Sequence, residues 1–283
     1  MGEFVEIFEV GPRDGLQNEK RAIPVREKVA LVDCLSRAGF RRIEVASFVS
    51  PRWVPQMADS AEVMARIRRE PTVSYAALTP NMQGFERAMD AGADEVAIFA
   101  SASEGFSRSN LNCSIAESLD RFRPVAEAAH AANVRVRGYV SCVTVCPFDG
   151  PVAPEAVVDV TEALVAMGVY EVSLGDTIGR GTPERMAAML EAVTAAVPAE
   201  DLAGHFHDTG GLALENIEVA LGFGLRVFDT AVGGLGGCPY APGAAGNVAT
   251  EAVHARLLAL GYETGLDAAV LEEAGGMARA MRG

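Results

Sequence analysis

Two histidines separated by one residue are the most informative feature of the sequence. His205 and His207 lie at the end of a β-rich run at 202–206, and residues two apart on a strand face the same side, so both imidazoles can reach one ion. By itself a His-x-His pair is more often a chance arrangement or a pair of hydrogen-bonded core histidines. Asp14 ends the first predicted strand and would lie nearby if the strands close into a barrel. We therefore predict a metal site held by these three residues.

Asn247 extends the predicted ligand set. It opens the last predicted helix of the barrel, where an Asn serves equally well as a helix cap. Two imidazoles, a carboxylate and an amide carbonyl form a mixed N/O set that suits Mg²⁺ or Mn²⁺. Zn²⁺ is less favoured because no thiolate accompanies the histidines, and Cys142 and Cys146 have no second pair at finger-like spacing. We interpret these two cysteines as structural.

Short β-rich runs alternate with helical patterns along the chain. The predicted strands are 5–10, 42–48, 73–78, 95–100, 134–140, 170–174, 202–206 and 226–232, and the predicted helices are 25–38, 61–69, 82–91, 115–132, 154–167, 183–196, 212–223 and 248–260. Strict alternation predicts a parallel sheet, and eight units favour a closed (β/α)8 TIM barrel over the alternative, an open doubly wound sheet. We expect one catalytic domain over residues 1–283, with a helical tail at 262–283.

Polar residues gather where the active sites of such barrels lie, at the carboxyl ends of the strands. Arg13, Asp14 and Gln17 follow the first predicted strand, and Glu44 lies on the second. Asp176 follows the sixth strand, and His205 and His207 lie at the end of the seventh. The eighth strand continues into a glycine-rich segment, 233–247, which is either a flexible surface loop or a lid that carries Cys238. A phosphate-binding loop is excluded because no Gly-Lys-Ser/Thr follows these glycines.

Composition excludes several classes of protein. The net charge of -14 argues against a nucleic-acid partner, which would require clustered Lys and Arg. Five dispersed cysteines predict a reducing compartment, and we expect the cytoplasm. The amino terminus reads as a strand and not as a signal peptide, and no apolar run is long enough to cross a membrane.

Four segments together resemble the 3-hydroxy-3-methylglutaryl-CoA lyases, a family of metal-dependent barrel enzymes. They are GPRDGLQNEK at 11–20, SFVSP at 47–51, HFHD at 205–208 and GGLGGCPY at 233–240, and the resemblance covers residues 4–260. Related isopropylmalate and homocitrate synthases usually carry a Gly-Glu-Arg-Ala-Gly-Asn-like segment in place of the one with Cys238. One departure is Gly210, where these lyases often have Tyr, so a contact from that position is in doubt.

The resemblance implies cleavage of 3-hydroxy-3-methylglutaryl-CoA to acetyl-CoA and acetoacetate, a step of leucine degradation, with Mg²⁺ or Mn²⁺. It also implies an acyl-CoA as the substrate partner and a homodimer. The alternative is a related Claisen-type synthase or an aldolase acting on another hydroxy acid or acyl-CoA. A barrel without activity that serves as a scaffold is disfavoured by the full set of polar residues at the rim.

The same resemblance assigns roles to the rim residues. Asp14 would accept the proton of the tertiary alcohol, directly or through a bound water or His205. Arg13 would stabilise the enolate that forms, and Arg13 and Gln17 would contact the substrate. Glu44 would orient Arg13, although a purely structural Arg13–Glu44 ion pair is a competing interpretation. Asp176 would orient catalytic groups from behind. Cys238 or His205 would return a proton to the enolate carbon.

Replacement of Cys238 tests this last role. Cys238→Ala should lower turnover by about a hundredfold or more, the usual size of a general-acid contribution, while metal affinity stays near that of the wild type. Steady-state kinetics and titration with Mn²⁺ measure the two quantities. A collapse of metal binding would instead identify Cys238 as a ligand.

Overall fold

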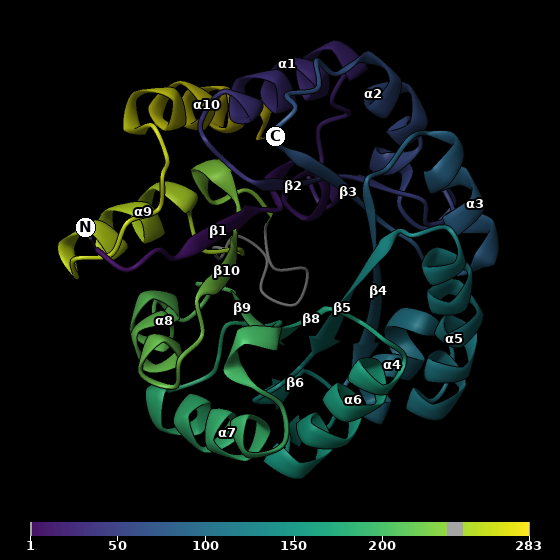
Figure 1. The fold of residues 1–283 in the computed structure, drawn as a ribbon, viewed down its shortest axis with the longest axis vertical. Helices are drawn as coiled ribbons and strands as arrows, with labels where there is room; N and C mark the ends of the chain where they lie inside the picture. Colours follow the sequence, from purple (N-terminus) through teal and green to yellow (C-terminus); the bar gives the residue numbers. More distant parts are fainter. Residues whose placement is uncertain (1, 237–245, 283) are drawn as a thin grey trace.

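The chain folds as a closed barrel of eight parallel strands inside a ring of helices (Figure 1). The structure is a computed structural model and describes residues 2–236 and 246–282. The strand order is β1-β10-β9-β8-β5-β4-β3-β2, and β1 closes the circle by pairing with both β10 and β2. The strands are β1 (Glu6–Glu9), β2 (Arg42–Ser47), β3 (Ser74–Leu78), β4 (Glu95–Ser101), β5 (Arg135–Ser141), β8 (Glu171–Asp176), β9 (Leu202–Phe206) and β10 (Val227–Thr230). The predicted TIM barrel is confirmed, and the open sheet is excluded.

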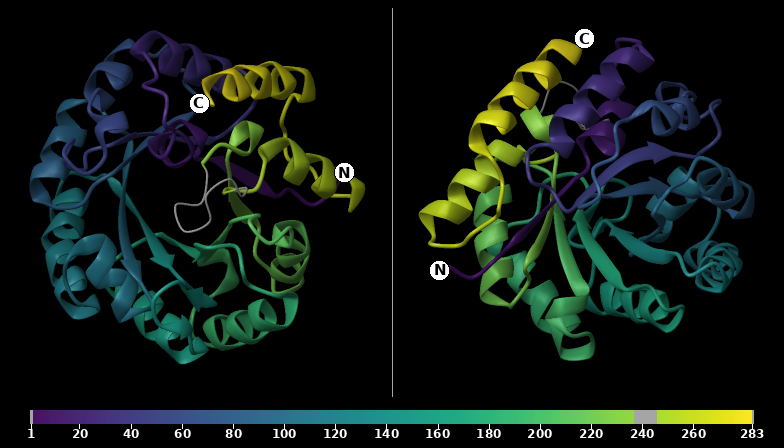
Figure 2. Two further views of the ribbon diagram at one scale, coloured as in Figure 1. Left: turned by 180° about the vertical axis from the view of Figure 1, so that it is seen from behind. Right: turned by 45° about the horizontal axis from the view of Figure 1, so that its top comes forward.

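A helix follows each barrel strand, as the alternating pattern predicted. These helices are α1 (Val25–Ser36), α2 (Ser60–Arg66), α3 (Met82–Asp90), α5 (Ile115–Ala131), α6 (Pro154–Ala166), α7 (Pro183–Ala196), α8 (Ala213–Gly222) and α9 (Thr250–Ala259). Some ends differ from the prediction by a few residues. The last barrel helix begins at Thr250 and not at Val248, because the Val248 N–H donates to the Phe206 carbonyl, 3.2 Å away. The predicted tail forms α10 (Ala268–Met281), which packs against α1 (Figures 1 and 2).

Several short elements were not predicted, and most of them have too few residues to show a period. They are the π-helical turn η1 (Gly11–Gly15), the 3-10 turns η2 (Pro55–Met57), η3 (Ala199–Asp201) and η4 (Val232–Gly234), helix α4 (Glu104–Leu111), and the hairpin of β6 (Val145–Cys146) and β7 (Gly150–Pro151). Cys142 and Cys146 are buried free thiols that pack with Phe106 beside this hairpin, in agreement with a structural role. Among the described residues, no helix is long and apolar enough to span a bilayer.

Charged side chains fill part of the barrel interior. Side chains alternate along a strand, so Arg137 and Tyr139 of β5 point inward while Val136 and Val140 on either side of them face the helices. Arg137 is 1% exposed and forms two ion pairs inside the barrel. Its Nε donates to Glu171 of β8 at 2.6 Å, and its two terminal nitrogens donate to Asp229 of β10 at 2.7 and 3.0 Å. A buried charge requires partners of this kind.

These pairs belong to a longer series that runs through the barrel. Glu171 also accepts from Arg42, near the amino-terminal ends of the strands, at 2.9 and 3.1 Å. At the other end Asp229 lies 3.2 Å from Nδ1 of His205 and also accepts from Ser173 at 2.7 Å. The buried series therefore connects the two ends of the barrel and reaches one of the predicted metal ligands.

Loss of Arg137 should destabilise the fold strongly. Arg137→Ala leaves Asp229 and Glu171 with fewer partners, and removal of one member of a buried ion pair typically costs about 3–5 kcal/mol. The free energy of unfolding from urea titration measures this effect. Arg123→Ala, an exposed position on α5, is the matched control and should stay within about 0.5 kcal/mol of the wild type. Equal stability of the two variants would contradict the structural importance of the series.

Candidate metal and active site

A tight turn after β1 positions the Arg13–Asp14 pair. The backbone N–H groups of Arg13, Asp14 and Gly15 all donate to the carbonyl of Val10, at 3.2, 2.8 and 3.2 Å. A side chain at Gly15 would place its Cβ 2.7 Å from the Cβ of Leu235, so the close approach of these segments requires glycine. The turn thus fixes two adjacent polar side chains at the carboxyl end of the barrel.

Glu9 braces this turn from inside. Its Oε1 accepts from the N–H groups of Gly11 and Val232, at 2.8 and 3.0 Å, and its Oε2 accepts from the Thr250 hydroxyl at 2.7 Å. Complete burial raises the pKa of Glu9 to about 7, although the hydrogen bonds oppose this shift. One carboxyl group therefore joins the end of β1 to η4 and to the start of α9. No motif of the sequence marks Glu9 as part of the site.

Asp14, His205 and His207 come together as predicted. Each offers a ligand atom, and these atoms lie within 4.8 Å of one another, a grouping able to hold a metal ion. The Nε2 of His205 is 4.0 Å from Oδ2 of Asp14, and the two imidazole centres are 5.4 Å apart. Nδ1 of His207 is buried and has no hydrogen-bond partner among the described residues.

The protonation states of His207 and Asp14 near pH 7 suit the binding of a divalent cation. Burial, followed by the charge of His205, lowers the pKa of His207 to about 4, so its imidazole is neutral near pH 7 and can donate a lone pair. Burial alone would raise the pKa of Asp14, but Arg13 and the two histidines outweigh it and hold that pKa at about 2. A carboxylate and an unpartnered neutral imidazole fit a hard or borderline metal ion.

Asp229 orients His205 and was missed by the sequence analysis. It accepts at Oδ2 from Nδ1 of His205, which leaves Nε2 directed toward Asp14. Burial alone would lower the pKa of His205, but the hydrogen bond and the charges of Asp229 and Asp14 raise it. Carboxylates behind ligating histidines commonly fix the tautomer in this way. An acidic residue inside the predicted strand 226–232, beside the histidine strand, was the available signal.

Arg13 is held in place on two sides. Its Nε donates to Glu44 at 2.5 Å, and Nη1 donates to Oδ1 of Asp14 at 2.6 Å. The guanidinium also lies over the ring of Tyr139, 5.6 Å from its centre. Burial raises the pKa of Glu44, although the charge of Arg13 opposes this shift. The Arg13–Glu44 ion pair is thus present, and it leaves the guanidinium beside the candidate metal ligands.

Gln17 and Asn247 both contact Asp14. The amide nitrogen of Gln17 donates to Oδ1 at 3.1 Å, and that of Asn247 donates to Oδ2 at 2.8 Å and to the Leu235 carbonyl at 3.3 Å. With Arg13, three side chains therefore donate to this one carboxylate. All three residues belong to the site predicted from the sequence.

Asp176 lies behind the site with its side chain turned toward two loops. It is 1% exposed and accepts from the Thr144 hydroxyl and the Gly181 N–H, each at 2.8 Å. Burial raises its pKa, although these hydrogen bonds oppose the shift. Its side chain thus fastens the loops after β5 and β8.

Cys238, the predicted proton donor, lies outside the described residues.

Gly210 is explained by a close backbone approach. Its N–H donates to the Gly179 carbonyl at 3.0 Å, and a Cβ at this position would lie 2.7 Å from that same oxygen. A larger residue would therefore require the two loops to separate. Where related lyases often have a Tyr side chain, this chain has a backbone hydrogen bond between the two loops.

The fold and this cluster define a (β/α)8 barrel with a candidate divalent-metal centre at the carboxyl ends of its strands. The chain belongs to the HMGL-like family, whose model matches residues 4–277.

Three relatives illustrate the similarity. The chain is 60% identical over 271 residues to the 3-hydroxy-3-isohexenylglutaryl-CoA/hydroxymethylglutaryl-CoA lyase of Pseudomonas aeruginosa, covering 96% of this chain and 90% of that one. The crystal structure of the HMG-CoA lyase from Brucella melitensis has a TM-score of 0.98 and 61% identity, covering 99% of both chains. An HMG-CoA lyase from A. baumannii, solved with coenzyme A and 3-methylmalate, has a TM-score of 0.93 and 36% identity, covering 98% of this chain and 91% of that one.

Two substitutions separate a candidate metal ligand from the residue that orients its neighbour. His207→Ala should weaken Mn²⁺ binding, because it removes an unpartnered buried nitrogen. Asp229→Asn should weaken Mn²⁺ binding by about 10- to 100-fold, the usual effect of changing a partner of a ligating histidine. Isothermal titration calorimetry measures both affinities, and circular dichroism confirms that each variant is folded. Unchanged affinity in His207→Ala would remove this residue from the ligand set.

Proposed function

We propose that this protein cleaves 3-hydroxy-3-methylglutaryl-CoA to acetyl-CoA and acetoacetate. The observation that carries the proposal is the Arg13 guanidinium hydrogen-bonded to Asp14, which itself lies against His205 and His207. This arrangement combines a cation for a developing oxyanion with a carboxylate and a metal-binding group. The lyase names of relatives at 60 and 61% identity support the same activity. Coenzyme A in the A. baumannii structure supports an acyl-CoA substrate.

We propose that Asp14, His205 and His207, joined by Asn247, hold Mg²⁺ or Mn²⁺. The amide nitrogen of Asn247 faces Asp14, and a half turn about its last torsion would present the carbonyl oxygen instead. A divalent cation at this position would supply a Lewis acid that lowers the pKa of the substrate hydroxyl and orients it. An O/N ligand set without thiolate supports these two metals over zinc.

Residues of this chain would accept the proton and stabilise the negative charge that develops. Asp14 accepts the proton of the tertiary alcohol as the bond between C2 and C3 breaks. The electron pair of that bond moves to C2 and the thioester carbonyl, where Arg13 stabilises the enolate oxygen. The loss of one such donor typically costs about 2.7–4 kcal/mol of activation free energy. Glu44 fixes the orientation of Arg13.

The reaction ends with protonation of C2, which yields acetyl-CoA. We assign this proton to Cys238, with His205 as the alternative donor. Gln17 contributes to substrate binding through its contact with Asp14. Asp176 acts at a distance, because its side chain fastens the loops after β5 and β8 on which the rim is built.

A second substrate is worth testing because of one relative. The P. aeruginosa lyase is named for 3-hydroxy-3-isohexenylglutaryl-CoA as well as for the methyl compound. Both compounds carry the same 3-hydroxyglutaryl-CoA unit and differ in the group on C3. The same catalytic residues would therefore serve both, and the space around C3 would decide the preference.

We also propose a single catalytic domain, a cytoplasmic location and a homodimer. The four cysteines in the described part of the chain are all unpaired, which supports a reducing compartment. Light scattering on the purified protein gives the oligomeric state directly.

An assay with purified protein tests the proposed activity. We expect acetoacetate to form from 3-hydroxy-3-methylglutaryl-CoA with Mg²⁺ or Mn²⁺, and activity to disappear after removal of the metal by EDTA. Arg13→Met should lower kcat by about 10²–10³, since it removes an oxyanion donor. Condensation of acetyl-CoA with a 2-oxo acid, without any acetoacetate formation, would instead identify a synthase.

A further inference from the structure

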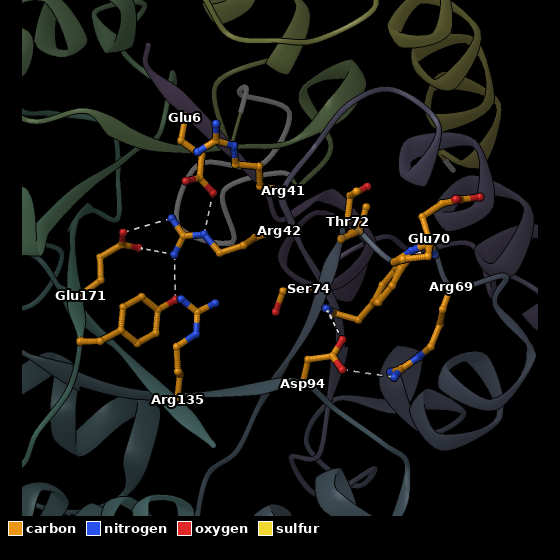
Figure 3. A pocket seen from close by; sticks show the side chains of 14 residues that line it. Glu6, Arg41, Arg42, Arg69, Glu70, Thr72, Ser74, Asp94, Arg135 and Glu171 are labelled. Atoms are coloured by element: carbon orange, nitrogen blue, oxygen red, sulfur yellow. Dashed lines mark hydrogen bonds and ion pairs between the residues drawn. The ribbon is translucent and has the colours of Figure 1, made fainter. Parts of the chain in front are cut away.

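A pocket lies at the end of the barrel opposite to Asp14, His205 and His207. It has a volume of about 840 Å³ and opens between the amino-terminal ends of the strands (Figure 3). Four arginines line it, Arg41, Arg42, Arg69 and Arg135. This concentration of guanidinium groups is notable in a chain with a net charge of -14.

Three of the four acidic side chains that line the pocket are already paired. Both oxygens of Glu171 accept from Arg42, which also donates to Glu6 at 2.6 Å and to the Tyr170 hydroxyl at 2.7 Å. Asp94 accepts from Arg69 through one oxygen and from a backbone N–H through the other. The back wall therefore offers few free acceptors to a ligand.

The arginines at the rim keep free donors. Arg41 forms no ion pair with any residue in the described ranges, and its guanidinium stacks on Phe4, 4.0 Å from the ring centre. Arg135 pairs with Glu95 at 3.1 Å through one nitrogen only, and it stacks on Tyr170 at 4.6 Å. Stacking on an aromatic ring restricts a guanidinium while its N–H edge stays available.

One carboxylate that lines the pocket, that of Glu70, forms no ion pair within the described residues. Glu70 is exposed to solvent and lies across the pocket from Arg41 and Arg135 (Figure 3). Its charge is hydrated and is separated from these two donors. The free hydrogen-bonding groups around Arg41 and Arg135 are thus mainly N–H donors.

We propose that this pocket binds a small anion that carries at least two carboxylate or phosphate groups. The planar fork of a guanidinium matches both kinds of group through paired hydrogen bonds. The volume falls within the range of about 300–1,000 Å³ that is usual for small-molecule sites. The Arg42–Glu171 pair gives the pocket a fixed floor, so little ordering is needed when the ligand binds.

A purely structural role is the competing explanation for these charges, since this end of a TIM barrel usually serves stability. Arg41 separates the two explanations. Because it forms no ion pair in the described part of the chain, its removal should leave the free energy of unfolding nearly unchanged. A ligand-binding role predicts instead that the same removal weakens anion binding.

Calorimetric titration of the full chain with citrate and with pyrophosphate tests the proposal, at constant ionic strength and without added metal. We expect saturable binding of at least one of these probes, weakened at least tenfold in Arg41→Ala and weakened further in Arg41→Ala/Arg135→Ala. Arg123→Ala, an exposed arginine on α5, is the matched control and should bind like the wild type. The two probes distinguish a carboxylate site from a phosphate site.

His207→Ala completes the design, because anions could also enter the metal site. Binding that persists in His207→Ala and falls in Arg41→Ala supports the pocket at the amino-terminal end. The absence of saturable binding to either probe would overturn the proposal. Equal affinity in Arg41→Ala and the wild type, or binding that disappears in His207→Ala, would overturn it as well. These outcomes do not depend on the proposed lyase activity, which is measured separately.

Discussion

The carboxylate of Asp229 holds two parts of the molecule together. On one side it accepts two hydrogen bonds from Arg137, and on the other it contacts Nδ1 of His205. A buried carboxylate is stable only when such partners are present, and a buried guanidinium needs its carboxylates equally. The orientation of a candidate metal ligand and the packing of the barrel interior therefore depend on the same group. Stability and chemistry are coupled at this point, and Glu171 extends the coupling toward the far end of the barrel.

The remaining residues of the site are positioned by short, strongly constrained backbone. His205 lies on β9, whose hydrogen bonds to both neighbouring strands fix its direction. Arg13 and Asp14 lie on a turn whose successive N–H groups share one carbonyl and whose base is braced by Glu9. A site of this kind needs little rearrangement before it acts, because its supports are rigid elements. Mobility is needed only where substrate enters and product leaves.

The sequence predicted the barrel because the alternation of strands and helices is regular and its boundaries carry glycine or proline. It also predicted the cluster of Asp14, His205 and His207, since all three lie at or just after the carboxyl ends of strands that meet at one rim. The supporting residues could not be predicted in the same way. Asp229 and Glu9 act through partners far away in sequence, and the choice of partner depends on strand register and on loop packing. The short hairpin of β6 and β7 carries no periodic signal.

The charged interior also limits how this sequence can change over evolution. Arg137 compensates the buried charges of both Glu171 and Asp229, so the neutral replacement of any one of the three leaves a buried charge with fewer partners. An apolar interior can drift through small exchanges of volume, whereas this one must change several residues together. Descendants would therefore keep the whole set or replace it in one coordinated step. Sequence divergence in this protein should accordingly concentrate in the outer helices and spare the inner wall of the barrel.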